Sequence, residues 1–261
     1  MMRRATEFIE RLGDWSLFSL RAIRGCFSGT LRGRDVVPIF FAIGVKSVGV
    51  VAITGLFIGM VLALQAYGQF HTYNLDTSIG AVANQTILSE LGPVLAAVML
   101  AGRVGSAMAA ELATMRVSEQ LDALSCLGVD PVHYLVTPRF LACMFLIPLL
   151  TVIADVSGIV GSVLVCNVAY DVDSFHYWNQ TMKFVGLWAV GSGLVKALVF
   201  GAVLSLICCH RGFTSGGGAA GVGQASTDAF VSSFVAILIL DFFLVYLLNT
   251  LKQLLHSGTF A

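Results

Sequence analysis

Charged and uncharged residues follow one another along this chain in long blocks. Seven arginines precede residue 35, and the 29 residues from Ser47 to Leu75 then contain no charged side chain. A helix that rises about 1.5 Å per residue needs about 20 apolar residues to cross the hydrocarbon layer of a bilayer. Five apolar segments are long enough, at residues 45–67, 88–110, 139–169, 185–209 and 227–250. The pattern therefore predicts an all-α membrane protein with five transmembrane helices.

The N-terminal region, residues 1–44, has a different pattern. Its apolar residues gather on one half of a helical wheel: Phe8, Ile9, Leu12, Trp15, Phe18, Ala22, Ile23 and Phe27. Acidic residues and arginines occupy the other half, which is typical of an amphipathic helix lying in the membrane interface with arginines toward anionic headgroups. Leu17 breaks the pattern. The alternative is a helix packed against the protein's own transmembrane helices.

Composition and charge distribution add an orientation. The chain is 57% hydrophobic and 11% charged, which favours one membrane domain over residues 45–261. The connection at 68–86 holds no Lys or Arg, and that at 170–184 holds only Lys183. By the positive-inside rule we expect a cytoplasmic N-terminus and a C-terminus on the opposite side. The net charge of zero gives no indication of nucleic-acid binding.

Charged residues inside the apolar segments are the main candidates for chemistry. Arg103, Asp155, Lys196 and Asp241 lie well inside four segments, and Glu90 lies near the start of the second. Each costs roughly 2.5–3.5 kcal/mol at mid-membrane, so each should face a partner or water. Lys196 and Asp241 fall at comparable depth and are the first candidates for pairing, whereas Glu90 falls nearer the outer face. Such charges line a substrate path, form a network that rearranges, or fix helix register as a buried ion pair.

Other motifs mainly exclude functions. The chain has no G-x-x-x-x-G-K-[ST], G-x-S-x-G or H-E-x-x-H motif, and its five histidines lack ligand spacing. We therefore expect no catalytic residue, metal site or cofactor in this chain. The stretch 216–221 matches G-x-G-x-x-G but follows an apolar segment, so we expect a flexible cytoplasmic loop. Asn84 and Asn179 match the glycosylation pattern, which often arises by chance.

Small residues are placed for close helix contact. They occur at Gly55 and Gly59, and again at Gly102, Gly105 and Ser106. Small residues let two helix backbones approach closely in a membrane. The contacts predicted in this way lie either within one chain or between two copies. The six cysteines lie mostly in or beside apolar segments, and we expect them to be packing residues.

The connection at 111–138 is the longest polar feature between apolar segments. Its sequence predicts a helix over 111–127 that ends at Gly128 and an Asp130-Pro131 turn. A short helix that projects from a membrane bundle suits contact with a cytoplasmic motor protein.

Three stretches of sequence resemble one known family. They are GLFIGMVLALQAYGQF, SELGPVLAAVMLAGRVGSAMAAELATMRVSEQLDALSCLGVDPVHYLVTPRF and TSGGGAAGVGQASTDAFVSS. In order and spacing they are similar to the MlaE/YrbE permeases, the membrane subunits of MCE-type ABC lipid transporters, over roughly residues 45–250. Ala220 and Gln224 depart from the acidic and basic residues common at these positions in the family.

The resemblance implies an assembly. It consists of a homodimer of this chain in the bacterial inner membrane, two cytoplasmic ABC ATPase subunits that bind ATP and magnesium, and a hexameric MCE-domain protein on the periplasmic side. A STAS-domain protein is a further partner that it allows, and membrane lipids are the substrate. The N-terminus would be cytoplasmic and the C-terminus periplasmic. The system's role would be in outer-membrane lipid asymmetry.

The resemblance also implies roles for particular residues. The residues expected to contact the ATPase lie on the helix at 111–127: Met115, Arg116, Glu119, Gln120 and Asp122. The residues expected to line a lipid cavity are Leu62, Gln65, Tyr73 and Glu90. The residues expected to form an intramembrane polar network are Arg103, Asp155, Lys196 and Asp241.

The residues and the resemblance together predict a permease subunit of an ABC transporter. It would move phospholipid or a related lipid between the inner membrane and a periplasmic MCE protein, powered by a separate ATPase. Two alternatives stay open: an ion-coupled secondary transporter that uses the intramembrane charges, and a non-transporting membrane scaffold. The absence of an internal repeat counts against a carrier, because carriers usually show paired halves.

Overall fold

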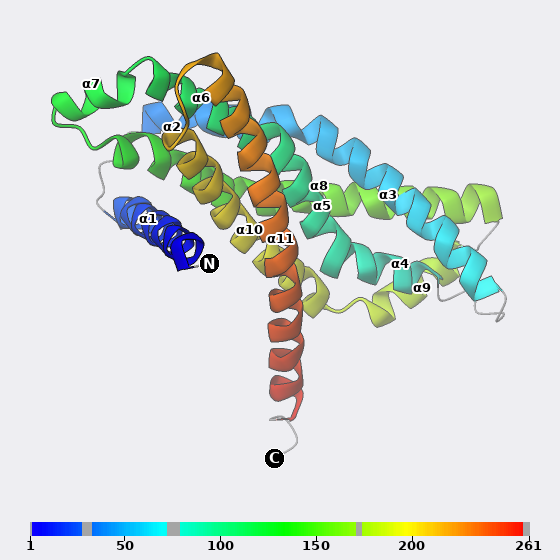
Figure 1. The fold of residues 1–261 in the computed structure, drawn as a ribbon. Coiled ribbons are helices and arrows are strands. Elements are labelled where there is room, and N and C mark those ends of the chain that lie inside the picture. Colours follow the sequence, from blue (N-terminus) through cyan, green and yellow to red (C-terminus); the bar gives the residue numbers. More distant parts are fainter. Residues whose placement is uncertain (1, 28–32, 72–78, 171–173, 258–261) are drawn as a thin grey trace. The chain divides into compact units, whose positions relative to one another are not determined.

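The computed structural model describes residues 2–27, 33–71, 79–170 and 174–257, and every regular element in these ranges is helical. The α-helices are α1 (Met2–Phe27), α2 (Gly33–Phe40), α3 (Lys46–Phe70), α4 (Ile79–Thr86), α5 (Gly92–Leu100), α6 (Ser106–Val117), α7 (Gln120–Cys126), α8 (Thr137–Tyr170), α9 (Ser174–Phe184), α10 (Leu187–Phe213) and α11 (Gly218–Ser257) (Figure 1). Four π-helical turns join them: η1 (Phe41–Val45), η4 (Ile87–Leu91), η5 (Ala101–Gly105) and η6 (Val132–Val136).

Five apolar helical stretches within the described residues are long enough to cross a membrane. They are Val36–Phe70, Ile79–Val117, Val132–Tyr170, Leu187–Phe213 and Gly218–Leu255. The prediction of an all-α protein with five transmembrane helices is confirmed. The helices extend beyond most of the predicted boundaries, because backbone hydrogen bonding continues past the point where polar side chains begin.

The chain forms two compact units. Unit 1 comprises Met1–Ile43, Leu100–Leu146 and Gly201–Ala236, and unit 2 comprises Gly44–Met99, Ile147–Phe200 and Ile237–Ala261. Each has a buried apolar cluster of its own. The cluster of unit 1 includes Leu112, Leu135 and Phe140, and that of unit 2 includes Ile79 and Tyr177.

In unit 1, the N-terminal helix α1 packs against other parts of its own unit. The ring of Phe18 lies edge-on to the rings of His210 and Phe213, at 5.3 and 5.5 Å between centroids. Ala22 is buried, and its carbonyl accepts a hydrogen bond from the Thr137 hydroxyl at 3.3 Å. These contacts support the alternative of a helix packed on its own bundle. The interfacial position remains a prediction.

In unit 2, small residues of α3 and α8 bring the two backbones together. A Cβ atom added at Gly55 would overlap the carbonyl of Ala154, and one at Gly59 would overlap the carbonyl of Gly158. These glycines therefore serve a contact within one chain, and only glycine fits there. In unit 1, Gly105 lies similarly close to the sulfur of Cys208.

Helices α4 and α9 lie side by side in unit 2 and share a buried polar network (Figure 1). The Tyr177 hydroxyl lies 3.1 Å from Asn84 Oδ1 and 3.0 Å from Ser162 Oγ, and the Asn84 amide donates to Thr181 Oγ1 at 3.2 Å. Burial raises the pKa of the Tyr177 phenol above its ordinary value. Asn84 is fully buried, so its match to the glycosylation pattern carries no function in this fold.

The glycine-rich stretch near residue 216 differs from the prediction. Helix α10 ends at Phe213 and α11 already begins at Gly218, so the flexible loop expected at 216–221 is helical over most of its length. Gly218 adopts a positive φ of 75°, which glycine tolerates and which lets the chain reverse within a few residues. The alanines that follow are strong helix formers.

All six cysteines are free thiols. Cys143, Cys166, Cys208 and Cys209 are buried, as the prediction of packing residues requires.

Candidate functional site

A buried lysine forms the centre of the most polar site in unit 2. Lys196 on α10 is only 1% exposed. Its Nζ lies 2.5 Å from Glu90 Oε2 and 3.2 Å from Asp241 Oδ1, and it donates a hydrogen bond to the Ser89 carbonyl at 3.0 Å. We call Ser89, Glu90, Lys196 and Asp241 the Lys196 cluster. It holds two carboxyl groups for one ammonium group, and residues from η4, α10 and α11 meet in it.

The close approach of α10 to η4 depends on a glycine one turn before the lysine. A Cβ atom at Gly193 would overlap the carbonyl of Leu88 in η4. Because residues three apart share a helix face, this contact also directs Lys196 toward η4. The sequence thus places a glycine where the backbones touch and a lysine where the carboxylates lie.

The pairing of Lys196 with Asp241, which the depth argument put first, is confirmed. Glu90 was assigned to a lipid cavity nearer the outer face, whereas in the structure its carboxylate contacts Lys196. Depth estimates from sequence miss such a contact, because a lysine side chain extends several ångströms along the helix.

The other two charges of the predicted network lie elsewhere. Asp155 on α8 is 6% exposed, and its Oδ1 has no hydrogen-bond partner among the described residues. A Cβ atom added at Gly92 would overlap this oxygen, so a larger residue there would require the Asp155 carboxylate to move. Arg103 lies in η5 and belongs to unit 1. The structure thus brings Lys196 together with Asp241 and Glu90, and not with Asp155.

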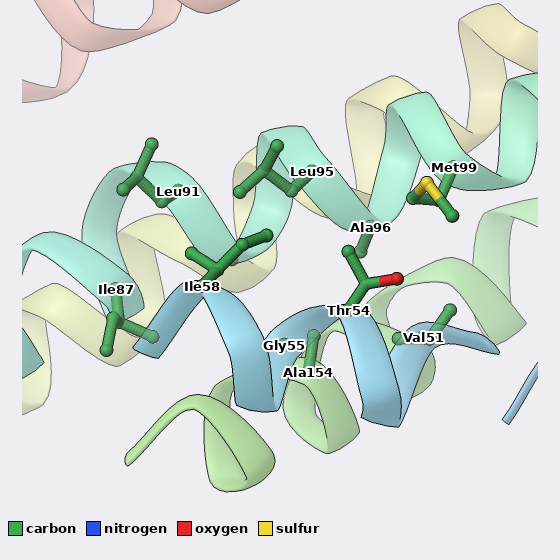
Figure 2. A pocket seen from close by; sticks show the side chains of 11 residues that line it. Val51, Thr54, Gly55, Ile58, Ile87, Leu91, Leu95, Ala96, Met99 and Ala154 are labelled. Carbon is green, nitrogen blue, oxygen red and sulfur yellow. The ribbon is translucent and has the colours of Figure 1, made fainter. Parts of the chain in front are cut away.

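A small apolar pocket in unit 2 lies between α3, η4, α5 and α8 (Figure 2). Its lining includes Thr54, Ile58, Leu91, Leu95, Met99 and Ala154. Figure 2 shows Thr54 and Ile58 projecting from α3 toward the helix that carries Leu95. The Thr54 hydroxyl donates to the Val50 carbonyl of its own helix at 2.7 Å. The pocket therefore presents hydrocarbon with no polar group in need of a partner.

The residues predicted to line a lipid cavity do not line this pocket. Leu62 is half-buried and Gln65 is exposed, both on α3, and Glu90 belongs to the Lys196 cluster. Tyr73 lies outside the described residues. The pocket residues on α3 and α5 had no signal in the sequence, since they resemble every other aliphatic residue in the spans.

The connection expected to contact an ATPase contains two helices instead of one. The single helix predicted over 111–127 is wrong, because α6 ends at Val117 and α7 begins at Gln120. The Ser118 hydroxyl donates to the Thr114 carbonyl at 2.8 Å and so competes with backbone hydrogen bonding. Glu119 follows in the left-handed region, with φ of 59°.

The side chains predicted for ATPase contact surround this break. Arg116, Glu119, Gln120 and Asp122 are exposed, and Met115 is half-buried. A shallow groove nearby is lined by Met115, Gln120, Ala123, Leu124, Leu127 and Tyr134.

An ion pair ties this connection to the start of α8 in unit 1. Arg139 is buried, donates to the Leu135 carbonyl at 2.8 Å, and pairs with Glu111 at 3.1 Å. A buried guanidinium held in this way fixes the base of α6 against α8.

Comparison with known proteins decides the family. The family described as permease MlaE matches residues 36–247, which is most of the chain. The chain belongs to the MlaE permease family. A probable ABC transporter permease protein of Rickettsia felis is 43% identical over 94% of this chain and 95% of its own length. A probable ABC transporter permease protein of Synechocystis sp. is 42% identical over 84% of each chain.

A further relative of this MlaE permease comes from a plant. The chloroplastic protein trigalactosyldiacylglycerol 1 of Arabidopsis thaliana is 39% identical over 83% of this chain and 62% of its own length. The chain is thus an ABC transporter permease in a membrane that it crosses several times, and the name of this class of permease implies an ATPase partner. The alternatives of an ion-coupled carrier and of a scaffold lose their support.

Proposed function

We propose that this permease moves phospholipid or a related lipid between the bacterial inner membrane and a periplasmic MCE protein, powered by a separate ATPase. The observation that carries the proposal is the pocket between α3, η4, α5 and α8. Its lining is aliphatic apart from Thr54, whose hydroxyl is already bonded to the backbone. Such a lining fits the apolar wall of a path for acyl chains, whereas an ion would need oxygen ligands.

The plant relative supports the choice of a lipid. The name of that protein contains trigalactosyldiacylglycerol, which is a lipid with two acyl chains. A second source of support is the distribution of charge in unit 2. The Lys196 cluster is confined to one place, and a lipid needs only a few polar groups for its headgroup and none along its acyl chains.

Different sets of residues have distinct roles in this proposal. Leu62, Gln65, Tyr73 and Glu90 remain the candidates for lining the wider lipid cavity. Lys196 and Asp241 hold α10 and α11 to η4, which supports the cavity from one side. Arg103 and Asp155 remain candidates for a wider polar network.

The proposed assembly is a homodimer with two ATPase subunits, which bind ATP and magnesium, and a hexameric MCE protein on the periplasmic side. A STAS-domain protein is a further candidate partner. Met115, Arg116, Glu119, Gln120 and Asp122 would contact the ATPase. ATP binding would then favour one state of the lipid cavity over another only as far as nucleotide binds the two states differently.

Reconstitution tests the function and the cluster together. The complex with its ATPase is placed in liposomes that carry a fluorescent phospholipid, and ATP-dependent transfer to the soluble MCE domain is measured. We expect transfer by the wild type and its loss in Lys196→Met, because breaking a buried ion pair costs about 3–5 kcal/mol. Lys183→Met is the matched control, since Lys183 is exposed on α9 and should leave transfer unchanged.

Two results would contradict the proposal. Wild-type complex that hydrolyses ATP and transfers no lipid would refute the function. Equal transfer in Lys196→Met and Lys183→Met would refute the role of the cluster.

A further inference from the structure

The Ser89 carbonyl has an unusual position within its helix. Ser89 lies in the π-helical turn η4, in which the Ile87 carbonyl accepts a hydrogen bond from the Gly92 N–H. Where the helix returns to α-helical bonding after this turn, the carbonyl of residue 89 would accept from the N–H of residue 93. Residue 93 is a proline, which has no N–H. The sequence therefore removes the usual donor of one particular carbonyl in the middle of an apolar stretch.

Lys196 supplies the missing donor. Its Nζ lies 3.0 Å from the Ser89 carbonyl. An ammonium group has three N–H donors. One bonds to this carbonyl and one to Glu90, while the contact with Asp241 at 3.2 Å is an ion pair without hydrogen-bond geometry. The carbonyl is thus one of only two hydrogen-bond acceptors of the ammonium group among the described residues, and the one that carries no formal charge.

We infer that Pro93 is a positioning residue, which keeps the Ser89 carbonyl available so that Lys196 is held between Glu90 and Asp241. The inference deepens the proposed function, on which its consequence for lipid transfer rests. A residue with an N–H at position 93 would compete with Lys196 for the carbonyl. The ammonium would then keep its charged partners but lose the contact that fixes its place along η4.

The test distinguishes the effect of the missing N–H at position 93 from the effect of the proline ring. One variant is Pro93→Ala, which restores the N–H. The other carries at position 93 an α-hydroxy acid with the side chain of alanine, introduced by nonsense suppression, so that an ester oxygen replaces the N–H. Pro148 inside α8 is the matched control, because it is a second helix-interior proline in unit 2 and lies outside the Lys196 cluster.

We measure the thermal unfolding temperature of the purified permease and ATP-dependent lipid transfer by the reconstituted complex. At position 93, alanine should lower both quantities relative to the hydroxy acid, which should behave like the wild type. At position 148, the alanine and hydroxy-acid variants should differ only by the hydrogen bond that an ordinary helix gains, with alanine the more stable. The difference in unfolding temperature between the alanine and hydroxy-acid variants should therefore have opposite signs at positions 93 and 148.

A second comparison places the same two changes at position 93 in a variant that lacks the charges of the Lys196 cluster. Removing Lys196 alone would leave two buried carboxyl groups, so the background combines Lys196→Met with Glu90→Gln and Asp241→Asn. In it, alanine at position 93 should be more stable than the hydroxy acid, as at position 148.

The inference is overturned if alanine at position 93 is as stable as the hydroxy acid, or more stable, when Lys196 is present. Failure of the proposed function looks different. In that case the contrast in unfolding temperature appears at position 93 while the wild-type complex transfers no lipid.

Discussion

At the scale of single residues, backbone conformation singles out Glu119. Its φ of 59° lies in the left-handed region, and it separates α6 from α7 in the connection proposed to meet the ATPase. An L-residue with a Cβ atom pays about 1–2 kcal/mol for this conformation, and glycine pays far less. A glutamate at this position therefore lowers the stability of the fold, which suggests that its side chain serves a contact with another molecule.

Glu119→Gly should raise the free energy of unfolding by up to about 1 kcal/mol, because it relieves the left-handed backbone. Thermal unfolding of the purified protein checks this. Asp122→Gly, at an exposed position in the first turn of α7, should instead lower it by roughly 0.5–1 kcal/mol, because it adds a glycine to the helix and removes an acidic residue from the helix N-terminus. A similar loss at both positions would show that Glu119 is not under backbone strain.

Tyr177 gives a second prediction at this scale. Tyr177→Phe removes a buried hydroxyl that bridges Asn84 and Ser162, and should cost about 1–3 kcal/mol of unfolding free energy. Tyr134→Phe, at an exposed position, should change it by less than about 0.5 kcal/mol. Equal effects in chemical denaturation would contradict the role of the network.

The same tyrosine should affect stability at high pH. Its pKa is raised in the folded state, so the fold binds this proton more tightly than the unfolded chain does. Its contribution is fully present below the unfolded pKa of about 10 and is lost as the pH rises through the folded value. The wild type should therefore lose stability more steeply than Tyr177→Phe above about pH 10.

At the scale of elements, the contact between α3 and α8 depends on missing side chains. Gly55 and Gly59 on α3 face backbone carbonyls of α8. Membrane helices gain little from burying apolar side chains against each other, because lipid is equally apolar, so close backbone contact supplies the attraction. Two of the four elements that line the apolar pocket, α3 and α8, are thus held together at glycine positions.

Gly59→Ala should separate α3 from α8 and lower the unfolding temperature markedly, since its Cβ would overlap the Gly158 carbonyl. Gly49→Ala on the same helix has open space around the added atom and should stabilise slightly, by about 0.5–1 kcal/mol. Thermal unfolding in detergent distinguishes the two. The packing argument fails if both alanines are tolerated equally.

At the scale of the whole molecule, the five candidate spans predict that the two ends of the chain lie on opposite sides of the membrane. The arginine-rich N-terminus should be cytoplasmic by the positive-inside rule. A fluorescent protein that matures only in the cytoplasm should therefore be bright at the N-terminus and dark at the C-terminus, and an alkaline phosphatase fusion should give the reverse. Both ends on one side would contradict the count of spans.

The sequence was sufficient for the helices and insufficient for the contacts between them. Hydropathy predicts spans because a helix that crosses the bilayer must be apolar over most of its length, and the five stretches are where it placed them. Depth made Lys196 and Asp241 the first candidates for pairing, and the structure shows the contact. The contact with Glu90, the break at Ser118 and Glu119, and the helical start of α11 depend on local hydrogen bonds and glycine conformations that hydropathy does not record.

The π-helical turns η1, η4 and η5 bear on how this chain is compared with its relatives. A π turn holds one residue more than the α-helical turn it replaces, while the helix faces before and after it keep their directions. A relative that lacks one residue at such a turn therefore presents the same side chains to the same neighbours. We therefore expect single-residue gaps in an alignment at 41–45, 87–91 or 101–105 to be changes in helix winding, with the residues on either side of them equivalent.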